Sequence, residues 1–267
     1  MEKSQKIHIR SDTQSAQNDP KNQSEINHDY FKWKTPLHIP MYTIAFLSFI
    51  YPPLVGVFCL VVYYLEGRIA GYLPTISETA TEYPNTKFFA QFISTGAMTT
   101  IATLFCYFNY FVITRKNQYS YKKETLNEKK LNFEKNFSPL ERTLQILIFT
   151  SALGIVALGF SPINEAHSRH LMSAVTGFLS ILMFEFLAFL NDPNKKCSKL
   201  VKIIRWSAWL IAFFSFILFA AAKWVFSHRI DVTISTFAEW ALLVFMLFIW
   251  STWKKELNSI EFSIVIL

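Results

Sequence analysis

Six long apolar runs dominate the chain and limit what it can fold into. Each is close to the length needed to cross the hydrocarbon core of a bilayer, which takes roughly 20 apolar residues. Inside hydrocarbon, every backbone N–H and C=O must be bonded within its own segment, so runs of this kind form helices. The sequence therefore predicts an all-α polytopic membrane protein, a bundle of six transmembrane helices over residues 41–65, 88–113, 143–160, 171–190, 206–225 and 232–253.

Composition supports a membrane domain flanked by polar ends. Of the 267 residues, 52% are hydrophobic and only 7 are glycine, which is unusual for a soluble domain. Residues 1–35 are rich in Asn, Gln, Ser, Asp and Lys, and are predicted to be a disordered cytoplasmic tail. Residues 36–257 then form the six-helix transmembrane domain, and residues 258–267 a short cytoplasmic tail.

The positive charge is distributed unevenly between the two sides of the predicted bundle. The net charge is +7, and most of the 26 basic residues lie before the first run, between the second and third, between the fourth and fifth, or after the last. The positive-inside rule therefore places both termini in the cytoplasm. Basic residues beside helix ends attract anionic lipid headgroups, so we expect anionic lipid at the cytoplasmic face and no nucleic acid partner.

Two carboxylates fall inside the predicted helices. Ionised carboxylates are costly in hydrocarbon, so such residues tend to face the bundle and to have partners there. Glu239 has Lys223 and His170 at the same predicted depth. Glu185 has no obvious partner, although Arg205 lies at the same inner level.

The polar stretch 73–84 is predicted to face outward, between the first two helices. It is rich in Ser, Thr and Glu and is bracketed by Pro74 and Pro84, a composition that favours a stiff, turn-rich segment. Such a segment can fold over the outer end of the bundle, which we call the outer mouth. The alternative is a plain surface connector.

Two further patterns leave alternatives open. Pro52 and Pro53 predict a kink in the first helix, either a packing feature or a gating hinge. The second helix carries small and polar residues on one face, a pattern of close helix contact or of a pore lining, at Gln91, Thr95, Thr99, Thr103 and Cys106.

Three motifs resemble one family of membrane proteins. The segment from Pro74 to Thr81, Pro-Thr-Ile-Ser-Glu-Thr-Ala-Thr, is similar to a Pro-x-Ile-Ser-acid-Thr-Gly-Thr signature that follows the first helix. The pattern from His170 through Ala174 to Phe178 resembles the start of the family's fourth helix, and Ala238-Glu239-Trp240 resembles its sixth. The family is the DRAM/FRAG-type group of six-helix proteins, with the damage-regulated autophagy modulators, the GPI-anchor remodelling proteins and the N-terminal domain of a yeast cell-wall biogenesis protein.

The resemblance implies a multi-pass protein of endolysosomal, Golgi or plasma membranes. It favours a DRAM-like, non-enzymatic regulator of autophagy or of a membrane lipid process, with membrane lipids and other membrane proteins as partners. The alternative is a GPI-anchor lipid-remodelling factor or a lipid-modifying enzyme. The expected lipid- or partner-binding site at the outer mouth consists of Pro74, Ser77, Glu78, Thr79, His170, Lys223, Glu239 and Trp240.

No nucleophile–base pair is recognisable from spacing alone, so no catalytic set is predicted. His170 is the one candidate general base for a metal-free acyl transfer. A zinc site of His167, His170 and His228 is the metal alternative, but no metal-binding motif supports it, and we expect neither a metal nor a cofactor.

Overall fold

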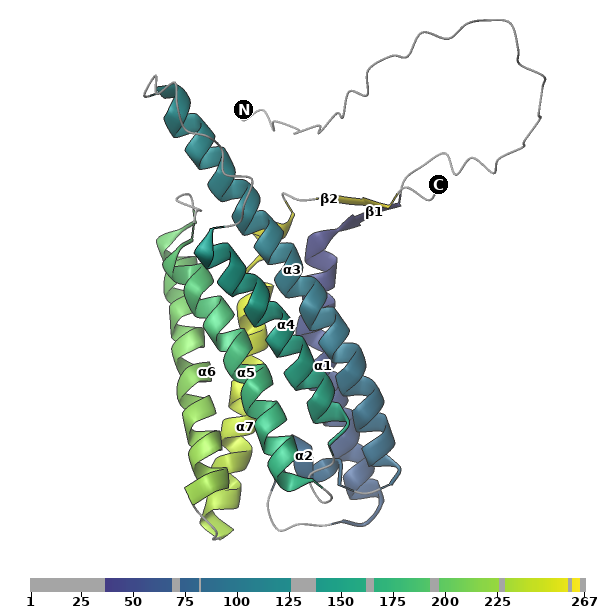
Figure 1. Cartoon of the computed structure of the whole chain (residues 1–267). Helices are drawn as coiled ribbons and strands as arrows, with labels where there is room; N and C mark the ends of the chain where they lie inside the picture. Colours follow the sequence, from purple (N-terminus) through teal and green to yellow (C-terminus); the bar gives the residue numbers. More distant parts are fainter. Residues whose placement is uncertain are drawn as a thin grey trace, which may run out of the picture. The chain divides into compact units, whose positions relative to one another are not determined.

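The computed structural model describes residues 37–68, 73–81, 83–125, 138–161, 166–192, 197–225, 229–258 and 261–264. Six long helices fill most of this part (Figure 1): α1 (Met41–Leu65), α3 (Asn85–Thr125), α4 (Pro139–Gly159), α5 (His167–Leu190), α6 (Lys199–Val225) and α7 (Arg229–Ser251). Two short helices and two strands accompany them: α2 (Ile76–Thr79), α8 (Lys254–Leu257), β1 (Leu37–Pro40) and β2 (Glu261–Ile264). The predicted tail 1–35 lies outside the described residues.

Each long helix contains a stretch that is long and apolar enough to cross a membrane. The predicted six-helix class is therefore confirmed, and the chain is an integral multi-pass membrane protein. Some helices begin earlier than their apolar runs, and at α4 polar capping residues set the start. At α4, the Ser138 side chain accepts from the Glu141 backbone and Glu141 accepts from the Ser138 backbone, so the helix begins at Pro139.

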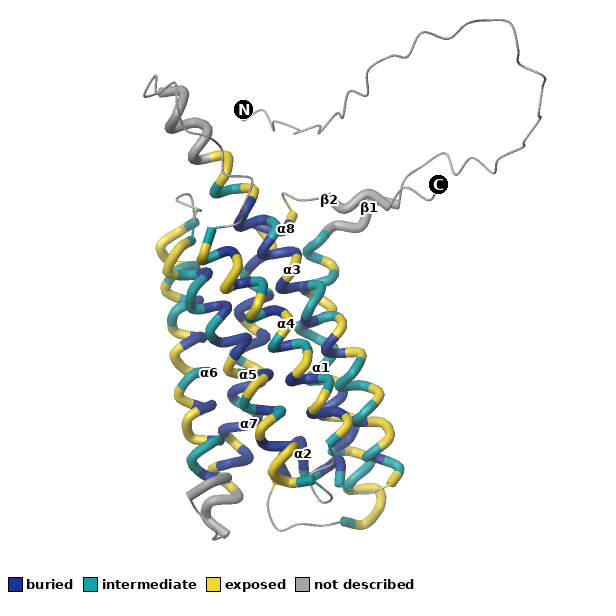
Figure 2. The backbone as a smooth tube through the Cα atoms, in the orientation of Figure 1, coloured by how far each residue is buried: buried dark blue, intermediate teal, exposed yellow. Residues whose placement is uncertain are grey.

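The six long helices form a closed ring in which each packs against the next and α1 packs against α7. Buried residues follow the faces by which the helices meet, and exposed residues follow the opposite faces (Figure 2). Many exposed side chains are large and apolar, such as Leu153 at 70% and Phe149 at 67%. In a chain of this class, these faces contact lipid.

Small residues allow neighbouring helices to approach closely. A Cβ atom on Gly154 of α4 would collide with the backbone of Gly177 of α5. Between α1 and α3, Ser48 Oγ lies 2.8 Å from Thr103 Oγ1 and donates to the carbonyl of Thr99 at 2.9 Å. The polar stripe of α3 therefore makes the predicted close contact at Thr99 and Thr103, whereas Thr95 is exposed.

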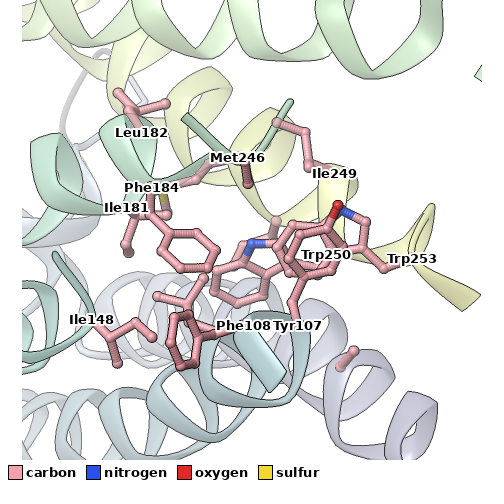
Figure 3. Packing of buried hydrophobic residues seen from close by; sticks show 14 of the residues in the cluster. Tyr107, Phe108, Ile148, Ile181, Leu182, Phe184, Met246, Ile249, Trp250 and Trp253 are labelled. Carbon is pink, nitrogen blue, oxygen red and sulfur yellow. The ribbon is translucent and has the colours of Figure 1, made fainter. Parts of the chain in front are cut away.

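An aromatic cluster fills the ring at the end opposite α2 (Figure 3). The rings of Tyr107 and Trp253 stack at 4.0 Å, and Trp250 lies beside them. Trp250 Nε1 donates to Glu185 Oε1 at 2.8 Å, so this buried carboxyl is bonded to an indole and not to Arg205. Arg205 instead forms a buried ion pair with Glu256 of α8, at 2.8 Å.

The two strands pair antiparallel, with Leu37 opposite Ile264 and Pro40 opposite Glu261. The segment before α1 therefore meets the segment after α7 at one end of the ring. Six spans place these two segments on the same side of a membrane, which allows them to meet. Neither strand was expected, because four residues beside a long apolar run carry no recognisable strand pattern.

Candidate functional site

The short helix α2 is built by its own sequence. Thr75 Oγ1 accepts from the Glu78 backbone N–H at 3.1 Å, and Glu78 Oε2 accepts from the Thr75 backbone N–H at 2.9 Å. This reciprocal pair is a capping box, which fixes one helical turn within the polar stretch. Glu78 thus has a local structural role. We call residues 73–81 the lid segment, and the end of the ring where it lies the α2 end.

Side chains from the start of α3 hold the far side of the lid segment. Asn85 Nδ2 donates to the carbonyls of Thr79 and Cys59, at 2.9 and 3.3 Å. Thr86 Oγ1 donates to the carbonyl of Ala80 at 3.0 Å. Ala80 stands where the family signature has Gly, and its φ of −102° is one that any residue can adopt. The lid segment thus needs no glycine at this position.

At the centre of the site, Ser77 bridges two transmembrane helices. Its Oγ lies 2.9 Å from Glu239 Oε1 of α7 and 3.0 Å from His170 Nε2 of α5. The other ring nitrogen, His170 Nδ1, lies 2.6 Å from the carbonyl oxygen of Ser161, just after α4. All three side chains are buried, with Ser77 at 5%, His170 at 3% and Glu239 at 7% exposure. A polar chain therefore joins four elements inside an apolar ring.

Proton counting leaves two arrangements for this chain. The Ser161 carbonyl can only accept, so His170 Nδ1 carries a hydrogen in both. In the ionic arrangement, His170 Nε2–H donates to Ser77, which donates to the Glu239 carboxylate. In the neutral arrangement, the Glu239 carboxyl donates to Ser77, which donates to bare Nε2. Both hold the same number of protons.

Trp240 secures the lid segment from the side. Its Nε1 lies 3.5 Å from the carbonyl oxygen of Pro74. Its ring covers Gly56 so closely that a Cβ atom there would come within 2.9 Å of the ring. The same ring packs against the small buried cluster of Ile76, Ala80 and Phe89. Trp240 therefore couples α1, α7 and the lid segment.

The structure thus brings most of the expected outer-mouth residues together, and these residues make different kinds of contact. Ser77, His170 and Glu239 form the central chain, Trp240 and Pro74 contact each other, and Glu78 and Thr79 shape the lid segment. The side chain of Lys223 lies outside the described residues.

Sequence reasoning did not find Thr75, Asn85 or Ser161. Thr75 was detectable from the Thr-x-x-Glu pattern of a capping box. Ser161 contributes only its backbone carbonyl oxygen, and a contact of this kind cannot be predicted from the residue type.

Among the described residues, no group of three His, Cys, Asp or Glu side chains could hold a metal ion. His167 is exposed, whereas His170 is buried in the ring, and His228 lies outside the described part. The described geometry offers the zinc alternative no support.

A groove of about 310 Å³ opens on the lipid-facing side of α6 and α7. It is lined by Ser215, Leu218, Thr233, Ile234, Phe237, Ala238 and Ala241. Ala238, one of the lining residues, belongs to a small buried cluster with Leu171 and Phe219. Leu171 follows His170 in sequence and Ala238 precedes Glu239, so the groove is adjacent to the site.

These features define a class: a multi-pass protein with a closed ring of six helices, whose one end holds a buried polar chain beneath a short lid. Residues 40–260 match the family described as the Frag1/DRAM/Sfk1/Cwh43P N-terminal domain. The chain belongs to this family, which confirms the resemblance carried by the three motifs. No curated protein and no solved structure gave a significant match.

Proposed function

We propose that this protein regulates a lipid process of an endolysosomal, Golgi or plasma membrane by binding a lipid headgroup at its α2 end. The observation that carries the proposal is the bridge from Ser77 to both His170 and Glu239. Placing an acid and an imidazole inside an apolar ring is costly, and polar residues within membrane spans are usually functional. A structural fastening for the lid segment alone would not need two ionisable groups.

The chemistry of the site suits a headgroup that both donates and accepts hydrogen bonds. When the lid segment moves, Ser77 leaves one nitrogen of His170 and one oxygen of Glu239 to be bonded by another group. A hydroxyl of a lipid headgroup can take the place of the Ser77 hydroxyl on both. The apolar groove beside the site suits the same molecule, because it can hold an acyl chain.

Family membership favours a regulatory role of the autophagy-modulator kind. The motif Ala238-Glu239-Trp240 resembles that branch, and both Glu239 and Trp240 contact the lid segment. GPI-anchor lipid remodelling is the second candidate, because a lipid bound at the same end of the ring would serve it equally well.

The proposal is tested by restoring the protein to cells that lack it. His170→Ala and Glu239→Ala are expected to abolish rescue of autophagic flux while both variants still insert in membranes, because they remove two polar side chains and leave the apolar residues of the spans unchanged. His167→Ala is the matched control, being an exposed histidine one turn away on the same helix. Full rescue by both site variants would overturn the proposal.

Mass spectrometry of GPI-anchor lipids in the same cells separates the two candidates. An altered acyl chain or an accumulated lyso-form would favour remodelling. An unchanged anchor profile together with reduced autophagic flux would favour the autophagy role.

A further inference from the structure

Three short contacts in the central polar chain need three hydrogens. His170 Nδ1 lies 2.6 Å from the Ser161 carbonyl oxygen, and His170 Nε2 lies 3.0 Å from Ser77 Oγ. Ser77 Oγ lies 2.9 Å from Glu239 Oε1. Each contact joins two electronegative atoms, so each needs one hydrogen between them. A serine hydroxyl and a neutral histidine bring two hydrogens, and an ionised carboxylate brings none. The closed chain therefore needs one further proton.

We propose that the lid segment closes with the uptake of one proton, which the His170–Glu239 pair holds, and that opening at neutral pH releases this proton. The inference rests on the proposed function in one respect, that the lid segment covers the place where a headgroup binds. It adds the regulation of that site, because protons then keep the lid segment closed.

The further proton has a defined place in the closed chain. Where Ser77 donates to Glu239, the hydrogen between Ser77 and His170 comes from Nε2, and the imidazole carries both of its hydrogens. The arrangement with a protonated Glu239 carboxyl holds the same total. When the lid segment moves away, Ser77 leaves both atoms and water takes its place. In water, an imidazolium loses its proton above about pH 6.5.

Other charged groups lie around the pair on the neighbouring elements. They are Glu78 of the lid segment, Lys87 of α3 and Arg169 of α5, together with Lys223 of α6 and Arg229 and Asp231 of α7, whose side chains lie outside the described residues. Carboxyl, ammonium and guanidinium groups in general exchange protons well outside pH 6–8, whereas imidazoles exchange them within it. Among the described residues, His167 is the other histidine at the α2 end, and it is exposed. It therefore serves as the control.

The expected pH dependence follows from proton linkage. Below about pH 6.5 the open and closed states both hold the proton, so the opening equilibrium does not change with pH. Above it the closed state alone holds the proton, so the opening constant rises about tenfold per pH unit. The rise from pH 6 to pH 8 is about 25-fold. The site is thus covered on an acidic side of a membrane and uncovered on a neutral side.

Glu239→Gln separates the need for a proton from the shape of the side chain. A glutamine amide brings its own hydrogen, so it can donate to Ser77 Oγ while Ser77 donates to His170 Nε2. All three contacts are then complete with a neutral histidine. The lid segment should therefore stay closed in this variant, and its opening should no longer depend on pH between 6 and 8.

The test measures opening of the lid segment in the full-length protein, in a neutral detergent, by the reaction of a buried cysteine with N-ethylmaleimide. Ala80→Cys places a thiol in the lid segment where the native residue is 5% exposed, and Leu73→Cys places one where it is 38% exposed. Because the reactivity of every thiol changes with pH, the rate at residue 80 is divided by the rate at residue 73. Peptide mass spectrometry separates both sites from the native Cys59, Cys106 and Cys197.

We expect this labelling ratio to rise about 25-fold from pH 6 to pH 8 when the central chain is unchanged. Glu239→Gln should abolish the rise. His167→Gln is the matched control, an exposed histidine one turn away on the same helix, and it should keep the full rise. Trp240→Ala should increase the ratio at every pH and keep the rise, because it removes packing on Ile76 without altering the chain.

Two results would overturn the inference. One is a ratio that does not rise between pH 6 and pH 8, including the absence of labelling at residue 80 even with Trp240→Ala. The other is a rise that persists in Glu239→Gln. Each variant is first shown to be monodisperse with a normal unfolding midpoint, and the unchanged chain tests the inference even where a variant does not fold.

Both results would leave the lipid-binding proposal standing, because that proposal depends on rescue in cells. Failed rescue together with an intact pH rise would reject the cellular role alone.

Discussion

At the residue scale, Arg205 and Glu256 show what a buried charge requires in this protein. Arg205 Nη2 donates to Glu256 Oε1 at 2.8 Å and to the Thr252 carbonyl at 2.7 Å, and Arg205 Nε donates to Thr252 Oγ1 at 2.9 Å. The two charged side chains are only 3% and 2% exposed. Removing one partner would leave the other charge buried and uncompensated, which costs far more than losing a surface ion pair.

We therefore expect Glu256→Ala to lower the free energy of unfolding by about 3–5 kcal/mol. The measurement is the unfolding midpoint in detergent, with Lys255→Ala as control because Lys255 is exposed on the same turn. The double variant Arg205→Met/Glu256→Leu should recover most of the loss, since it removes both charges. Equal midpoints for Glu256→Ala and Lys255→Ala would show that the pair does not stabilise the fold.

Single residues were only partly predictable from sequence. Ser77, His170 and Glu239 were expected at one end of the bundle, because side and depth follow from charge distribution and helix length. Ser77 lies between the other two because of the one-turn helix α2 and because of how α5 and α7 are rotated about their axes. The apolar runs predict neither feature. The partner of Arg205 was missed because Glu256 follows the last run and is turned inward by α8.

At the element scale, close packing of two helices depends on glycines, which have no side chain. The α4–α5 contact brings Gly154 against the backbone of Gly177, which cannot move aside as a side-chain tip can. Gly96 of α3 is different, because a Cβ atom there would have its nearest neighbour, the Tyr51 ring, at an ordinary 3.9 Å.

This contrast gives a paired prediction. Gly154→Ala should lower stability by about 1–3 kcal/mol through overpacking. Gly96→Ala should be neutral or gain up to about 1 kcal/mol, because Ala is the better helix former. Thermal unfolding of both variants in the same detergent measures the difference. If Gly154→Ala is as stable as Gly96→Ala, the α4–α5 helices are not in close contact at this point.

The long apolar helices were predictable from sequence, whereas the short elements were not. Six runs gave six long helices, because hydrocarbon permits no other local structure. Their ends were less predictable, since capping residues such as Ser138 and Glu141 lie outside the apolar runs. The strands β1 and β2 pair with each other, so neither segment can be recognised as a strand from its own sequence.

At the scale of the whole molecule, the orientation in the membrane follows from charge and remains a prediction. The α2 end is expected to face the lumen or exterior, and the α3–α4 connection the cytoplasm. An Asn-x-Thr sequon on a short Gly/Ser insert after Gly67, which is exposed, should be glycosylated. The same insert after Asn127 should not be, and glycosidase digestion with gel mobility distinguishes them. The reverse pattern would invert the orientation and place Ser77 on the cytoplasmic side.

The closure of the ring by α1 and α7 has a consequence for biosynthesis. The lid segment is translated directly after α1, yet two residues that hold it, Glu239 and Trp240, belong to α7, the last of the six long helices described. Until α7 is inserted, Ser77 and His170 lack their acidic neighbour, and α1 lacks one of its walls. A chain that stalls before α7 therefore keeps these polar groups and an unpaired helix face open to the translocon and its chaperones. In this way, a chain that lacks α7 exposes features that distinguish it from a chain whose ring has closed.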